Sequence, residues 1–240
     1  MNYEIKVFKN KQILAETTTI DLLNARAESP KNRRFNMALA GGNTPRSIYK
    51  QWLTIQDDRL WRKVHFFWGD ERCVPPGDED SNYKMAHDSI LSKIKISDKQ
   101  IHRIRGEINP EMELQRYSCE IKEHLPIVNN FPQFDWILLG LGTDGHTASL
   151  FPNSETLKEH SSIYVIAQHP QTGQRRISLT LPVINNARKV TFLVAGEEKA
   201  EIVHKIFRDK KNSLNLPAAK IKPHAGILQW YLDEAASSKL

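Results

Sequence analysis

The stretch that decides the fold is the apolar run Trp136-Ile137-Leu138-Leu139-Gly140-Leu141-Gly142, with Asp144-Gly145-His146-Thr147-Ala148 shortly after it. An apolar run of this length that ends in glycines is typical of a buried strand whose last residues turn sharply. The turn would place an acid and an imidazole at the carboxyl end of the strand. In open α/β sheets that edge is where ligands bind.

Three other apolar runs end in the same way. Residues 37–40, 65–68 and 191–195 lead into Gly41-Gly42-Asn43-Thr44-Pro45-Arg46, Gly69-Asp70-Glu71-Arg72 and Gly196-Glu197-Glu198-Lys199. If the four strands are parallel, their glycine-rich ends meet along one rim of a sheet. That rim is the candidate active site, and strands that alternate with helical stretches predict an α/β fold.

The remaining segments supply the other elements of such a fold. Helices are predicted over 19–27, from Pro45 onward, through 85–91 with Ser81 or Asn82 as the cap, over 111–125, through 200–207 and over 227–236. Strands are predicted over 3–8 and 163–167. Residues 176–181 alternate polar and apolar side chains, which is typical of a strand with one face in water.

Length and composition limit the class of protein. The 240 residues suffice for one large domain, 1–240, that buries a core without disulfides. No apolar run approaches the roughly 18 residues that a membrane span needs. Residues 1–8 lack the pattern of a signal peptide, and Cys73 and Cys119 match no metal or redox spacing. We therefore expect a cytoplasmic protein that does not act at a membrane.

The chain carries a net charge of +6, which would attract anions from nucleic acid to a phosphorylated metabolite. The basic residues are spread along the chain, with the densest cluster at 205–211, and no aromatic interleaving or helix-turn-helix pattern accompanies them. A solvated basic surface is thus favoured over binding to nucleic acid.

The double glycine Gly41-Gly42 suits an anionic ligand. Glycines let backbone N–H groups approach a ligand closely, and the helix that starts near Pro45 directs the positive end of its dipole to the same place. The segment is neither a dinucleotide fingerprint nor a Walker loop. A turn that only connects strand and helix is an equally good interpretation of this segment alone.

His146 is the candidate base, because an imidazole at a strand end can accept a proton from water near neutral pH. Asp70 could orient that base or grip a hydroxyl, although taken alone it fits an ion pair at a strand end better. Asp144 and His146 could ligate a metal, but no paired histidines or cysteines support one. Ser149 and Cys73 lack the local signatures of nucleophiles, so covalent catalysis is disfavoured.

Arg176 and Lys199 are the cations best placed for an anion. Arg176 opens a strand and Lys199 follows the fourth glycine-closed strand. A guanidinium matches phosphate with two hydrogen bonds, whereas an ammonium supplies a point charge. Either residue could instead lie on the surface, and only their joint placement favours a functional role.

These segments resemble those of the 6-phosphogluconolactonase family, which hydrolyses a sugar-phosphate lactone in the oxidative pentose phosphate pathway. The similarity spans nearly the whole chain, and its most specific block is 144–152. The similar segments are 40–45, 67–75, 80–83, 139–152, 176–180, 196–200 and 216–219.

The resemblance implies a three-layer α/β/α sandwich around a mainly parallel, Rossmann-like sheet, and it implies no cofactor and no metal. It also implies that His146 activates water against the lactone carbonyl, while Asp144 and Asp70 orient the base or the substrate. Asn43 stands where the family often has serine, and both residues can donate a hydrogen bond. The implied substrate pocket consists of Gly41, Gly42, Asn43, Thr44, Arg46, Arg72, Arg176 and Lys199.

The nearest alternative is a glucosamine-6-phosphate deaminase, which carries a glutamate directly before the proline of the same loop. Phe151 precedes Pro152 here, and phenylalanine cannot transfer a proton. A sugar-phosphate sensor is a further alternative, but the sequence shows no output module. The expected partner is a small-molecule sugar-phosphate lactone rather than nucleic acid or a membrane, and the expected assembly is a monomer or weak homodimer.

Overall fold

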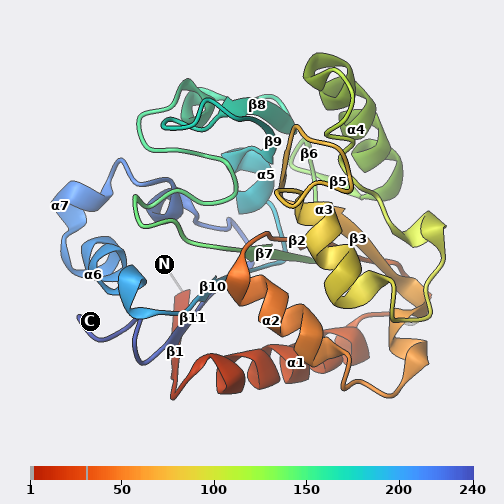
Figure 1. Ribbon diagram of the computed structural model, residues 1–240, viewed down its shortest axis with the longest axis horizontal. Coiled ribbons are helices and arrows are strands. Elements are labelled where there is room, and N and C mark those ends of the chain that lie inside the picture. Colours follow the sequence, from red (N-terminus) through yellow and green to blue (C-terminus); the bar gives the residue numbers. More distant parts are fainter. Residues whose placement is uncertain (1–2, 31) are drawn as a thin grey trace.

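A sheet of six parallel strands forms the centre of the computed structural model, which describes residues 3–30 and 32–240 (Figure 1). The strand order is β1-β11-β10-β7-β2-β3. Every residue of β2, β3 and β7 is buried, which explains why these strands are continuous apolar runs in the sequence. The six strands are β1 (Tyr3–Phe8), β2 (Phe35–Leu39), β3 (Val64–Trp68), β7 (Trp136–Leu139), β10 (Lys189–Val194) and β11 (Ile227–Asp233).

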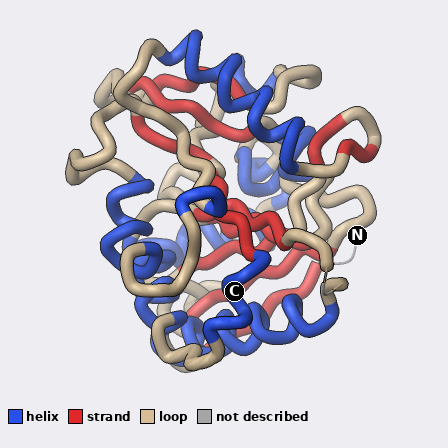
Figure 2. The backbone as a smooth tube through the Cα atoms, turned by 90° about the vertical axis from the view of Figure 1, so that its right-hand side faces the viewer, coloured by secondary structure: helices blue, strands red, loops and turns tan. Residues whose placement is uncertain are grey.

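Helices lie on both sides of this sheet, which confirms the predicted α/β/α sandwich. In Figure 1, α1 and α2 lie below the sheet and α5 lies above it. Figure 2 shows the strands enclosed between helices from a second direction. The helices are α1 (Lys11–Glu28), α2 (Asn43–Trp52), α3 (Asn82–Ala86), α4 (Pro110–His124), α5 (Leu181–Asn185), α6 (Ala200–Arg208) and α7 (Lys210–Ser213). Short 3-10 or π turns are η1 (Asp58–Lys63), η2 (His87–Leu91), η3 (Asp98–Gln100), η4 (Glu155–Lys158), η5 (Glu197–Lys199) and η6 (Pro217–Lys220). No helix of the described residues is long and apolar enough to cross a membrane.

A second, antiparallel sheet starts at the carboxyl edge of the large one, because only Gly69 separates β3 from β4. Its strands are β4 (Asp70–Arg72), β9 (Arg175–Leu179) and β8 (Tyr164–Gln168), in the order β4-β9-β8. A short hairpin joins β5 (Ile127–Val128) and β6 (Phe131–Pro132). The small sheet places strand residues from distant parts of the chain beside the rim.

The four glycine-closed strands lie next to one another, as predicted. They are β10, β7, β2 and β3, consecutive in the sheet and all parallel. Tyr49 of α2 also fixes the end of β2: its hydroxyl accepts from the N–H of Ala40 at 2.9 Å and donates to the carbonyl of Ala40 at 2.8 Å. The turn at Gly41 and Gly42 therefore starts from a fixed point.

Two local predictions are wrong. Residues 227–236 were expected to be helical, but Ile227–Asp233 form β11 between β1 and β10. All of β11 after Ile227 is buried, and a short apolar run that is buried on both faces cannot be told from a buried helix by periodicity. The polar face of β9 was expected to be in water, whereas Ser178 and the following Thr180 are buried.

Candidate active site

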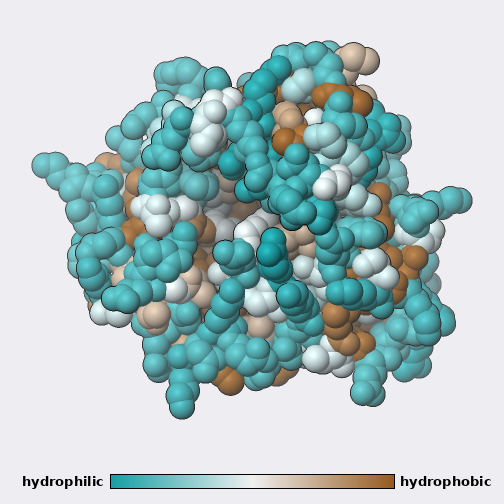
Figure 3. Space-filling view, viewed as in Figure 1, coloured by the Kyte–Doolittle hydropathy of each residue, from teal (hydrophilic) through white to brown (hydrophobic). Residues whose placement is uncertain are grey.

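A cavity of about 220 Å³ opens at the carboxyl ends of β2, β3 and β7. Figure 3 shows hydrophilic side chains around a hollow near the middle of this face. Residues from all four predicted rim segments line the cavity. The predicted site residues in this lining are Gly41, Gly42, Asp70, Arg72, His146, Arg176 and Lys199.

Four predicted residues are not part of the lining. Asn43 and Thr44 form the first turn of α2, directly after Gly42. Asp144 contacts His146 and lies beside the lining residues. Arg46 instead lines a separate cavity beside Lys50. The structure thus brings together the carboxyl ends of the strands, whereas the surface of α2 that carries Arg46 faces a different cavity.

The loop after β7 holds His146 in place through its own backbone. The N–H of Gly142 donates to the carbonyl of His146 at 2.9 Å, and the N–H of Gly145 donates to the carbonyl of Gly142 at 3.0 Å. Gly145 has a φ of 87°, which favours glycine. A Cβ on Gly142 would lie 2.1 Å from Nδ1 of His146, so the imidazole can occupy this position only if residue 142 is glycine.

Asp144 sets the tautomer of the imidazole. Nδ1 of His146 lies 2.6 Å from Oδ1 of Asp144, and the N–H of His146 donates to the same oxygen at 3.0 Å. Partial burial raises the pKa of Asp144, but these two hydrogen bonds outweigh it and lower the pKa to about 2. An ionised carboxylate only accepts, so in the neutral imidazole Nδ1 carries the proton and Nε2 carries the lone pair.

Phe151 packs between the candidate base and a candidate anion-binding side chain. Its ring centroid lies 4.9 Å from that of His146 and 5.7 Å from Cζ of Arg176. Phe151 is 2% exposed, so neither His146 nor Arg176 can take its place unless this buried ring is displaced. The side chain of His146 remains 27% exposed and is accessible to solvent and ligand.

Two arginines face each other across the small sheet. Arg72 of β4 pairs in register with Arg176 of β9, and both line the cavity. Like charges directly opposite in a sheet are destabilising. Burial lowers the pKa of Arg176. The negative charge of Asp70 opposes this effect, and the positive charge of Arg72 adds to it. An anion between the two guanidinium groups would relieve this repulsion, as expected of a phosphate site.

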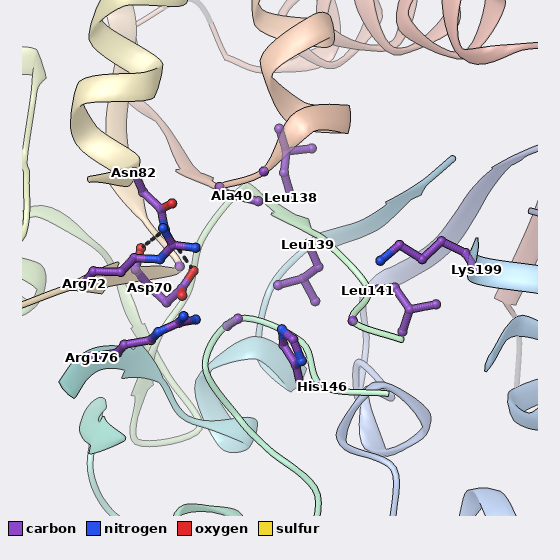
Figure 4. A pocket seen from close by; sticks show the side chains of 16 residues that line it. Ala40, Asp70, Arg72, Asn82, Leu138, Leu139, Leu141, His146, Arg176 and Lys199 are labelled. Carbon is purple, nitrogen blue, oxygen red and sulfur yellow. Dashed lines mark hydrogen bonds between the residues drawn. The ribbon is translucent and has the colours of Figure 1, made fainter. Parts of the chain in front are cut away.

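Lys199 extends toward the same cavity from the opposite side, after the end of β10 (Figure 4). Figure 4 also shows Asp70 beside Arg72 and Arg176, with His146 between this group and Lys199. Negative charge on a ligand would therefore meet cations from two directions, and the imidazole lies between them.

The side chains of Asp70-Glu71-Arg72 have two different roles, because successive residues of a strand point to opposite faces of the sheet. Asp70 and Arg72 line the cavity. Glu71 points away and accepts hydrogen bonds from the N–H groups of Asn82 and Tyr83, both at 2.7 Å. Burial raises the pKa of Glu71 to about 7 although these N–H groups favour its ionised form. Glu71 therefore fixes the start of α3.

Two residues near Asp70 were not predicted as site residues. Nδ2 of Asn82 donates to the carbonyl of Asp70 at 2.9 Å, and Ser149 donates to Oδ2 of Asp70 at 2.6 Å. Asn82 also lines the cavity, and a Cβ on Gly41 would lie 1.9 Å from its Oδ1. The sequence suggested Asn82 only as an alternative helix cap, and Ser81 is the residue that caps α3.

The described residues contain no group of three or more His, Cys, Asp or Glu side chains that could hold a metal ion. The chemistry of the cavity consists of one imidazole paired with a carboxylate, one buried carboxylate and three cations. This set can move a proton and bind an anion. It suits the addition of water to an activated carbonyl of an anionic molecule.

Comparison with known proteins shows which family the chain resembles. A family model described as glucosamine-6-phosphate isomerases/6-phosphogluconolactonase matches residues 9–230. The chain is 43% identical over 210 residues to the 6-phosphogluconolactonase of Haemophilus influenzae, covering 87% of this chain and 88% of that one. A crystal structure of a devB protein superposes with a TM-score of 0.94 at 38% identity and full coverage of both chains.

A more distant solved structure extends this similarity. The 6-phosphogluconolactonase of Trypanosoma brucei superposes with a TM-score of 0.87 at 27% identity, covering 100% of this chain and 99% of that one. The match of the family model covers well over half of the sequence. The chain therefore belongs to the family of glucosamine-6-phosphate isomerases and 6-phosphogluconolactonases.

Proposed function

We propose that this protein hydrolyses 6-phospho-D-glucono-1,5-lactone to 6-phospho-D-gluconate. One observation carries the proposal: a single cavity contains an imidazole whose Nδ1 is held by a carboxylate and a cross-strand pair of arginines suited to a phosphate. The relatives named 6-phosphogluconolactonase support the identity of the substrate.

In the proposed mechanism His146 is the general base. Nε2 takes a proton from a water molecule whose oxygen attacks the lactone carbonyl carbon. The bond from that carbon to the ring oxygen then breaks, and Nε2 returns the proton to the departing oxygen. Asp144 stabilises the imidazolium that forms between the two steps, as a carboxylate on Nδ1 does in other imidazole bases. The protein itself forms no covalent bond to the substrate.

Binding energy from the phosphate would position the reacting carbonyl. Arg72 and Arg176 lie together on one side of His146 and Lys199 lies on the other, so the arginine pair would hold the phosphate end of a sugar while its lactone end reaches the base (Figure 4). Interactions with a distant group can be used in this way to orient a reacting centre. A δ-lactone carbonyl is already activated, so the proposed step needs neither a metal nor a nucleophilic side chain.

The alternative within the family is deamination of glucosamine 6-phosphate. Phe151 packs directly against the ring of His146, at the place in the sequence where that reaction would need a carboxyl group. A phenyl ring neither donates nor accepts a proton, which favours hydrolysis of the lactone.

The test uses the purified protein with two substrates. Acid release from freshly prepared 6-phosphogluconolactone is followed against the spontaneous rate, and ammonia release from glucosamine 6-phosphate is followed in parallel. We expect acceleration of the first reaction and no ammonia from the second. Ammonia release, or a lactone rate equal to that without protein, would refute the proposal.

A further inference from the structure

We infer that Ser149 is a positioning residue, which holds Asp70 and Arg176 apart and thereby keeps the Arg176 guanidinium available to the ligand. Its side chain stands between the two charged groups. The identity of the ligand as a phosphorylated lactone rests on the proposed function, whereas the contacts of Ser149 do not.

The hydroxyl of Ser149 is both a donor and an acceptor. Its Oγ donates to Oδ2 of Asp70 at 2.6 Å, and Nη1 of Arg176 donates to the same Oγ at 3.4 Å. Ser149 is fully buried at 0% exposure, and Asp70 is 6% exposed. The described side chains of Asp70 and Arg176 therefore meet through a hydroxyl rather than in a direct ion pair.

The backbone around Ser149 fixes the hydroxyl at this place. The N–H of Ser149 donates to Oγ of Ser178 at 3.1 Å, and Ser178 is the register partner of Asp70 in the small sheet. The preceding residue, Ala148, has a φ of 49°, in the left-handed region that non-glycine residues seldom adopt. Such a conformation persists only where its surroundings enforce it. The turn that directs Ser149 inward is thus held by its neighbours.

Removal of the hydroxyl would leave two unmatched groups in a buried place. Oδ2 of Asp70 would lose its donor, and Nη1 of Arg176 would lose its acceptor. Opposite charges attract strongly where water is scarce, so the guanidinium would close onto the carboxylate. Arg176 would then be neutralised by Asp70 and drawn away from the ligand. The consequence is weaker binding of the phosphorylated substrate with a smaller effect on the chemical step.

The experiment compares Ser149→Ala with the matched control Thr18→Val. Thr18 is also fully buried, and its hydroxyl donates at 2.8 Å to the carbonyl of Leu14 within α1, which contributes nothing to the cavity lining. We expect Ser149→Ala to raise KM for 6-phosphogluconolactone about tenfold, the usual scale of a hydrogen bond to a charged group, and to change kcat less than threefold. KM for unphosphorylated gluconolactone should be unchanged, and Thr18→Val should alter neither constant.

A double variant shows whether Ser149 acts through Arg176. In an Arg176→Ala background, Ser149→Ala should have no further effect on KM, because the group that it positions is gone. Ser149→Cys provides a second variant if the alanine variant folds poorly, since a thiol fills the same space and hydrogen-bonds only weakly. Equal KM values for wild type and the Ser149 variants, or additive effects in the double variant, would overturn the inference.

Binding of inorganic phosphate, followed by ³¹P NMR, separates this inference from the proposed function. Weaker phosphate binding by Ser149→Ala supports the positioning role even if the wild type fails to hydrolyse the lactone. Conversely, normal lactone hydrolysis by wild type together with equal phosphate affinity in both proteins would overturn the role of Ser149 and leave the proposed function intact.

Discussion

Gly142→Ala tests whether the position of the imidazole controls the reaction. The added Cβ would lie 2.1 Å from Nδ1 and 2.3 Å from Cε1 of His146, and 2.6 Å from Oδ1 of Asp144. Ordinary contacts of a Cβ begin at 3.4 Å, so the ring has to retreat by roughly 1.3 Å. A misplacement of about 1 Å in an active site costs about 100-fold in rate. We therefore expect kcat for 6-phosphogluconolactone to fall about 100-fold, or about 2.7 kcal/mol in the activation free energy.

The assay is steady-state hydrolysis of the lactone, with thermal unfolding to verify that the variant is folded. Gly77→Ala is the control, because no atom lies within 4 Å of the Cβ that it adds. The ¹H NMR signal of the hydrogen-bonded Nδ1 proton should shift or disappear in Gly142→Ala and remain in Gly77→Ala. A folded Gly142→Ala protein with the kcat of wild type would refute the reasoning that the ring must stay where this glycine allows it.

Two further predictions concern the anion site and a buried histidine. Arg176→Ala should raise KM for the phosphorylated lactone at least tenfold, because it removes a charge-assisted contact, and leave KM for unphosphorylated gluconolactone nearly unchanged; equal changes for both substrates would rule out a phosphate contact. Nδ1 of His65 lies 2.9 Å from Nε2 of His102. Burial lowers the pKa of His65 to about 4, and the charge of His102 is the next largest cause. Between about pH 6.5 and pH 4 the unfolded chain binds a proton at His65 that the folded protein does not, so the free energy of unfolding falls on acidification through this window. His65→Asn keeps a polar atom near the position of Nδ1 and cannot titrate. Between pH 7 and pH 4.5 its free energy of unfolding, measured with urea, should fall by about 2 kcal/mol less than that of wild type. Equal decreases in the two proteins would contradict this assignment.

The rim of the site could be predicted from sequence because its signals are local. Glycines that close apolar runs mark the ends of β2, β3, β7 and β10, and parallel strands bring such ends together whatever their order in the sheet. His146 and Asp144 are two residues apart, so their contact also depends on one loop only. Predicting these features requires no knowledge of how distant segments of the chain pair.

The contacts between distant segments could not be predicted. Arg72 and Arg176 face each other because β4 and β9 pair in one register, which the alternation within either strand does not specify. Ser149 reaches Asp70 only after this pairing has formed. The strand β11 was missed because burial on both faces removes the period that distinguishes a strand from a helix.

His146→Ala is the most direct test of the central claim, that Nε2 of this imidazole deprotonates the attacking water. Positioned proton transfer is worth about 10²–10⁴ in rate, so we predict that kcat on fresh 6-phosphogluconolactone falls at least about 100-fold while inorganic phosphate still binds with wild-type affinity. A folded His146→Ala protein that hydrolyses the lactone with an unchanged kcat would contradict the account.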